Sequence, residues 1–124
     1  MARTRSDAQR DSWSDASEQA RRSAQVLCAV ARSVLGGARG AGVTLDRECD
    51  EALIVVERWC HGDASEAEVR DAARAVTLRR ADASAIDTSG RWRRRACDAV
   101  LRACDEVGAA PEGGARERVS LVGV

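Results

Sequence analysis

The sequence predicts an all-α fold, a compact bundle of about four helices. In four separate segments, apolar residues recur every three or four positions, which is the spacing of an amphipathic helix. Glycine-containing or polar stretches separate these segments, and no segment alternates apolar and polar residues as a half-buried strand would. The four predicted helices span approximately residues 14–35, 46–61, 66–81 and 91–107.

The length of 124 residues is that of one domain. All four periodic segments fall within residues 13–108, which we assign to a single helical domain. Residues 1–12 are polar and carry several arginines, so they predict a flexible N-terminal arm. Residues 109–124 hold the only proline and a glycine pair, and they predict a flexible tail.

The first two helices have apolar faces and recognisable ends. Gly36-Gly37 is expected to end the first helix, and Thr44 or Asp46 is expected to cap the second. The apolar stripe of the first helix is Ala20, Ala24, Leu27, Cys28, Ala31, Val34 and Leu35. That of the second is Cys49, Ala52, Leu53, Val56, Trp59 and Cys60.

The clearest local signals lie between the second and third helices. Gly62 suits the left-handed conformation that closes a helix, and Ser65 with Glu68 forms a capping box that opens the next one. The third helix then runs towards Arg80. Residues 82–90 contain Asp, Ser and Thr and are expected to break the helical pattern. The fourth helix carries Trp92, Ala96, Ala99, Val100, Ala103, Cys104 and Val107 at helical spacing and stops at Gly108.

The apolar composition predicts a core of small side chains. The chain has three Trp but no Phe or Tyr, so Ala, Val, Leu and Cys must fill the interior. A core of this kind has little hydrophobic surplus, and we expect a partner or a second copy of the chain to complete it.

The charge distribution argues against binding driven by overall electrostatic field. All twenty basic residues are Arg, which fits the coding bias of a GC-rich genome, and the formal net charge is zero. Nucleic-acid and membrane-surface binders usually carry surplus positive charge. The middle of the chain is acidic, however, with six Arg and eleven Asp or Glu between residues 46 and 90.

The cysteines and the apolar runs predict a soluble, cytoplasmic protein. Five cysteines at irregular spacing do not form a disulfide framework, so a reducing compartment is expected. The N-terminal residues contain no apolar signal region. The longest strongly apolar run, Leu53–Val56, is far too short to span a bilayer.

Cys60 and His61, the only histidine, are adjacent and raise the question of a reactive or metal-binding pair. Neighbouring residues on a helix point about 100° apart, so adjacency does not place a nucleophile against its base. Zinc needs three or four ligands, and the chain contains no Cys-x-x-Cys pair. The sequence therefore predicts no catalytic, cofactor or metal site, and Cys60-His61 is interpreted as a helix end.

Two charged sets are candidates for partner contact. The first is an acidic face that would bind another protein of basic character: Asp46, Asp50, Glu51, Glu57, Asp63 and Glu66. The second surrounds Trp92 and would grip nucleic acid: Arg91, Arg93, Arg94 and Arg95. The alternative is that these arginines pair, inside the bundle, with the acidic middle of the chain, residues 46–90. The zero net charge favours this alternative.

Residues 52–76, ALIVVERWCHGDASEAEVRDAARAV, resemble a segment of small all-helical bacterial immunity proteins. The likeness is carried by Trp59, Gly62, Ser65, Val69, Ala72 and Ala73. It implies a protein that neutralises a toxin, such as a basic nuclease, by direct binding.

The sequence as a whole predicts a non-enzymatic, helical protein-binding module. The resemblance makes an immunity-type protein its specific form, with a basic toxin as partner. Two alternatives stay open. One is a small nucleic-acid-binding protein that uses the arginine cluster, and the other is a structural or regulatory component of a larger bacterial assembly.

Overall fold

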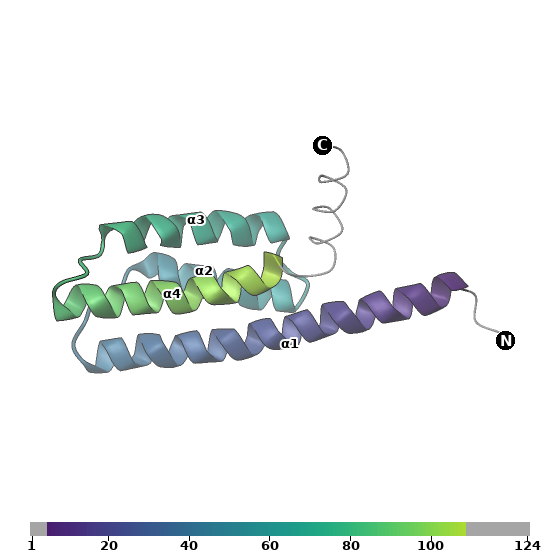
Figure 1. Cartoon of the computed structure of the whole chain (residues 1–124), viewed down its shortest axis with the longest axis horizontal. Helices are drawn as coiled ribbons and strands as arrows, with labels where there is room; N and C mark the ends of the chain where they lie inside the picture. The colour runs from purple at the N-terminus through teal and green to yellow at the C-terminus, as the bar shows by residue number, and fades with distance from the viewer. Residues whose placement is uncertain (1–4, 109–124) are drawn as a thin grey trace.

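The computed structural model describes the backbone of residues 5–108 and the side chains of residues 17–108, and the predicted tail lies outside this range. The described part contains four helices and no strand (Figure 1). The helices are α1 (Arg5–Gly40), α2 (Arg47–Cys60), α3 (Glu66–Asp82) and α4 (Thr88–Gly108). The predicted all-α bundle is confirmed.

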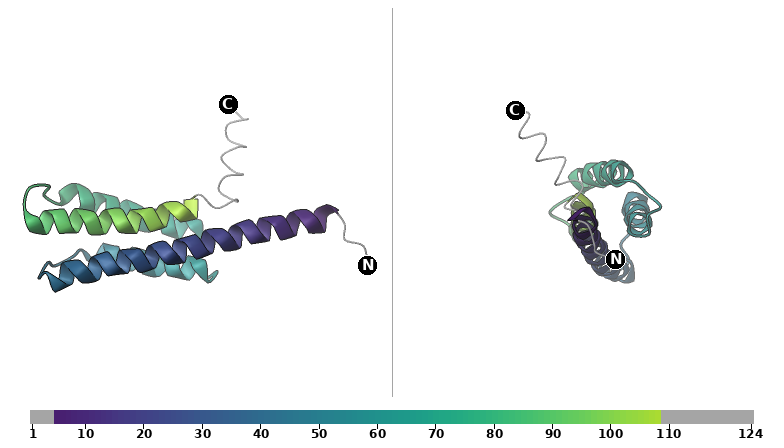
Figure 2. Two further views of the ribbon diagram at one scale, coloured as in Figure 1. Left: turned by 60° about the horizontal axis from the view of Figure 1, so that its bottom comes forward. Right: turned by 90° about the vertical axis from the view of Figure 1, so that its right-hand side faces the viewer.

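The helices run alternately up and down and pack side by side around one core (Figures 1 and 2). Helix α1 packs most extensively on α4, and α2 contacts all three other helices. Helix α1 is much longer than its neighbours. Its N-terminal part therefore projects beyond the end of the bundle, as both side views show.

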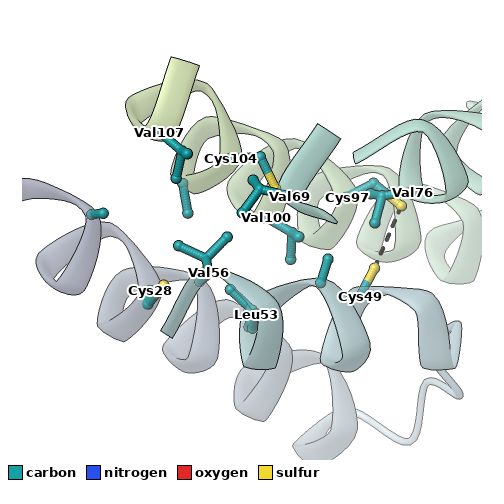
Figure 3. Close-up of a cluster of buried hydrophobic side chains, with 14 of the residues drawn as sticks. Cys28, Cys49, Leu53, Val56, Val69, Val76, Cys97, Val100, Cys104 and Val107 are labelled. Carbon is teal, nitrogen blue, oxygen red and sulfur yellow. Dashed lines mark hydrogen bonds between the residues drawn. The ribbon is translucent and has the colours of Figure 1, made fainter. Parts of the chain in front are cut away.

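Small apolar side chains fill the core, as the composition predicts (Figure 3). The largest fully buried residues are Leu35 and Leu53, and the rest are mainly Val, Cys and Ala. No polar or charged residue is buried among the described side chains. Close packing of such small groups leaves the stability of the bundle dependent on many modest contacts.

Helix α1 differs from its predicted boundaries at both ends. It begins at Arg5, so most of the predicted arm is helical, and it continues through Gly36-Gly37 to Gly40. The prediction that this glycine pair ends the helix is wrong. The helix continues because Ala38 is fully buried on the core face and Gly37 lies against the ring of Trp92, where an added Cβ would stand 3.5 Å from the indole.

Gly42 closes α1 instead, with a φ of 81°. The N–H of Gly42 donates to the carbonyl of Arg39 (3.0 Å), and that of Val43 donates to Ala38 (3.0 Å). This pair of hydrogen bonds is a Schellman motif, which satisfies the last carbonyls of a helix.

The predicted turn between α2 and α3 is confirmed. Gly62 has a φ of 80°, and the N–H groups of Gly62 and Asp63 donate to Trp59 and Arg58 in the same motif. Ser65 is the N-cap of α3, and its Oγ accepts from the N–H of Glu68 (3.1 Å). Both signals are local, which is why the sequence alone reveals them.

The N-termini of α2 and α4 are less regular. Asp46 occupies the N-cap position of α2, but its side chain makes no capping hydrogen bond. Helix α4 begins at Thr88, one turn before the predicted start, because Asp87 Oδ1 accepts from the N–H of Gly90 (2.6 Å). Gly90 must be glycine here, since an added Cβ would meet the carbonyl oxygen of Ser84 at 2.0 Å.

Candidate functional site

Cys60 and His61 differ in burial, although both border the same small hollow. Cys60 is buried, and its Sγ donates to the main-chain carbonyl of Arg21 on α1 (3.5 Å). His61 is exposed at the C-cap of α2. The two side chains line a small hollow together with Gln25, Cys28 and Glu57.

The thiols of this hollow are poor nucleophiles. Burial is the main cause that raises the pKa of Cys28 to about 12, and burial also raises the pKa of Cys60. Both thiols therefore stay protonated at neutral pH, whereas the thiolate is the reactive form. The carboxylate of Glu57 is held by Arg32 of α1, with Nε to Oε2 at 3.1 Å. Within residues 17–108, no three His, Cys, Asp or Glu side chains gather as a metal would require.

Most carboxylates of the predicted acidic face lie in ion pairs with arginines of the same chain. Three of these pairs, together with two that use Glu48 and Glu68, tie α2 and its N-cap to the neighbouring helices. We call the five the ion-pair seam: Arg32–Glu57 and Arg39–Asp50 to α1, Arg79–Glu48 and Arg58–Glu68 to α3, and Arg93–Asp46 to α4. Pairing inside the molecule leaves less negative charge on this face than the sequence count implies.

The other members of the predicted acidic face differ in exposure. Glu51 lies on the outer side of α2, where its carboxylate is 3.7 Å from Arg47. Asp63 is exposed in the turn after α2, and its main-chain carbonyl accepts from Arg58 Nη2 (2.7 Å). Glu66 is the half-buried first residue of α3. The six residues thus form a scattered band along α2 and its turns.

Two of the four arginines in residues 91–95 also turn inward. Arg93 donates to both carboxylate oxygens of Asp46 (3.1 Å), in the least exposed ion pair of the seam, with side-chain exposures of 26% and 16%. Arg94 Nε donates to the carbonyl of Ala83 (2.9 Å), and Arg95 lies 5.4 Å from the ring of Trp92. Arg91 is exposed. Internal pairing is therefore found for Arg93, whereas Arg91 and Arg95 are exposed and line a small hollow with Thr88 and Trp92.

A groove between α3 and α4 is the main surface feature that the sequence reading missed. Its volume is about 610 Å³, and its lining is mostly apolar. Arg70, Ala73, Arg74, Thr77 and Leu78 form one wall, and Leu101 and Asp105 form the other. Leu78 is 69% exposed. It falls outside the apolar stripe of α3, and this position was the sequence signal that could have indicated the groove.

A second hollow continues this groove towards the ends of the helices. It shares Arg70, Ala73 and Asp105 with the first and extends to Glu66 and Gly108. The α3–α4 groove, defined by the residues of both hollows, therefore runs along much of α3 and the C-terminal part of α4.

None of the described helices combines the length and the apolar character that crossing a membrane requires. Comparisons with protein-family models, with curated proteins and with solved structures gave no match to this chain.

Proposed function

We propose that this chain is a non-enzymatic module that binds another protein through the α3–α4 groove. The observation that carries the proposal is Leu78, a large apolar side chain that is 69% exposed at the edge of a mostly apolar groove. Exposed apolar surface of this kind is typical of docking sites for amphipathic helices.

The charges at the rim define the chemistry of the partner. Arg70 and Arg74 flank the groove on α3, and Asp105 flanks it on α4. Among the described side chains, Arg74 pairs with the exposed Asp71 at 3.4 Å, so it is available to a partner at little cost. The fitting occupant is a partner helix with an apolar face, acidic residues towards α3 and a basic residue towards α4.

The acidic face supports binding less strongly than the groove does. Asp46, Asp50 and Glu57 already pair with arginines from other helices, and a partner would have to compete with those pairs. An immunity role, with a toxin as the bound protein, rests on the resemblance of residues 52–76 and is retained as the specific form of this proposal. Nucleic-acid binding is the weaker alternative, because Arg93 and Arg94 are engaged inside the molecule.

Site-specific photo-cross-linking tests the proposal. A photoreactive amino acid is placed at Leu78 in the groove, at Glu51 on the acidic face and at Glu18 on exposed α1 as a control. The partner captured from native cells is identified, purified and titrated against the wild type, Leu78→Asp and the double variant Arg70→Glu/Arg74→Glu. We expect cross-linking from position 78 and binding at least about tenfold weaker in both groove variants.

Other outcomes would replace the proposed surface or the proposed function. Cross-linking from position 51, with binding lost in Glu51→Arg/Asp63→Arg, would move the site to the acidic face. A cross-linked species that nuclease removes would instead favour the nucleic-acid alternative. A toxin identified as the partner would support the immunity role.

A further inference from the structure

Two buried cysteines from different helices are in direct contact. Cys49 lies in the first turn of α2 and Cys97 in α4, and their Sγ atoms are 3.7 Å apart (Figure 3). Both residues are at most 1% exposed. All five cysteines lie in the described part of the chain as free thiols, and this is the one pair for which the structure gives a contact between sulfur atoms.

The sulfur–sulfur distance is short enough to consider a disulfide between these two residues. An S–S bond is about 2.05 Å long, so the sulfur atoms must approach by less than 2 Å. The thiols already face each other across the packed α2–α4 interface, and side-chain rotation supplies much of such an approach. The bond would join α2 to α4 across 48 positions of the sequence.

The local charges give the two thiols different roles. The hydrogen bond between the two sulfur atoms lowers the pKa of Cys97, and the positive charge of Arg93 acts in the same direction, against burial and Asp46. The same hydrogen bond, together with burial, raises the pKa of Cys49. Cys97 is therefore the member that more readily supplies a thiolate.

We propose that Cys49 and Cys97 are an oxidisable dithiol that a small peroxide converts into an intramolecular disulfide. The thiolate of Cys97 attacks one oxygen of hydrogen peroxide, breaks the O–O bond and becomes a sulfenic acid, with release of hydroxide. The sulfur of Cys49 then attacks the sulfenic sulfur and displaces the second hydroxide. The two thiol protons convert both hydroxides to water, so two thiols are oxidised and one peroxide is reduced.

The remaining cysteines provide an internal comparison. Burial raises the pKa of Cys28 to about 12 and that of Cys104 to about 11, and neither has a sulfur contact in the structure. Burial keeps both thiols protonated, and although Cys60 and Cys104 lie near enough to Cys28 to raise its pKa, neither makes a sulfur–sulfur contact with it.

Peptide mapping of the folded protein tests the proposal. The wild type is treated with hydrogen peroxide, remaining thiols are blocked, and the protein is digested with trypsin, which places each cysteine on a separate peptide because every one is bounded by arginines. We expect residues 48–58 linked to residues 96–102 as the main product, at least about tenfold above any other cysteine pair, because the two thiols are held together.

Variants and a denatured control make the result decisive. Cys97→Ala should abolish the linked peptide, whereas Cys28→Ala, the matched control, should leave its yield unchanged. In urea the preference for this pair should disappear. The proposal is overturned if Cys49 and Cys97 remain thiols in the folded protein, or if other pairs form to the same extent.

Discussion

Helix α1 packs on α4 mainly through small apolar side chains, whereas α2 is also tied to all three neighbours by the ion-pair seam. Among the described side chains, no ion pair joins α1 to α4. The two regions thus use different interactions to hold helices together. The α1–α4 contact depends on close packing that excludes water, and the contacts of α2 depend also on charges near the surface.

This difference shows how a bundle without Phe or Tyr can hold four helices in one arrangement. Small residues allow close approach but define the helix faces poorly, because many registers of Ala and Val pack about equally well. Arginine–carboxylate pairs are directional and penalise wrong pairings. We therefore expect the core to supply most of the stability and the seam to contribute mainly to specificity.

The largest effect is expected from shortening a side chain in the core. Leu35→Ala should lower the free energy of unfolding by about 2–5 kcal/mol, because Leu35 is only 1% exposed and its removal leaves a cavity. Urea unfolding measures the change. Val26→Ala is the control on the same helix, since Val26 is 62% exposed, and it should cost less than about 0.5 kcal/mol. Similar losses in both variants would contradict this view of α1.

Alkaline pH should weaken the core before it weakens the seam. The pKa of Cys28 is raised from 9.0 to about 12, so above pH 9 the unfolded chain loses this proton while the folded protein keeps it. The stability from this thiol is fully present below pH 9 and falls by about 1.4 kcal/mol per pH unit until pH 12. The cations of the seam are all arginines, because the chain has no lysine, and a guanidinium stays charged over this pH range.

Urea unfolding of the wild type and Cys28→Ala between pH 8 and 11 measures this dependence. The variant should lose stability less steeply above pH 9, whatever its stability at pH 8. Identical slopes would show that Cys28 does not titrate differently in the folded and unfolded chains.

Within the seam, the Arg93–Asp46 pair should matter most. Arg93→Ala leaves a carboxylate that is only 16% exposed without its bidentate partner, and should cost about 1–2 kcal/mol. Arg74→Ala removes an equal charge from a contact whose side chains are 77% and 74% exposed, and should cost less than about 0.5 kcal/mol. Thermal unfolding at low and high salt compares them. Equal losses would mean that partial burial does not strengthen the seam.

The sequence predicted what depends on nearby residues. The apolar periodicity gave the number of helices, and Gly62 and Ser65 marked the α2–α3 turn because their hydrogen bonds span only a few positions. It also favoured pairing of the arginines of residues 91–95 with the acidic segment, and Arg93 does donate to Asp46, 47 positions away. It did not predict which arginine meets which carboxylate, since that depends on the helix faces that meet.

The candidate groove was missed for a related reason. Leu78 and Leu101 come from separate helices, and a periodicity analysis examines one helix at a time. An apolar residue outside the apolar stripe of its helix indicates a groove only when the adjacent helix places another such residue next to it. The Cys49–Cys97 contact was likewise invisible in the cysteine spacing, which indicates only that no disulfide framework is present.

The smallest effect concerns the glycines that misled the prediction for α1. Gly36→Ala should raise the free energy of unfolding by about 0.5–1 kcal/mol, because an added Cβ meets no atom within 4 Å and alanine favours the helix. Gly42→Ala is the matched control and should be destabilising, because Gly42 has a φ of 81°. Urea unfolding distinguishes the signs. If Gly36→Ala destabilised the protein, the glycine pair would be a real break, and Ala38 would have to reach the core without a continuous helix.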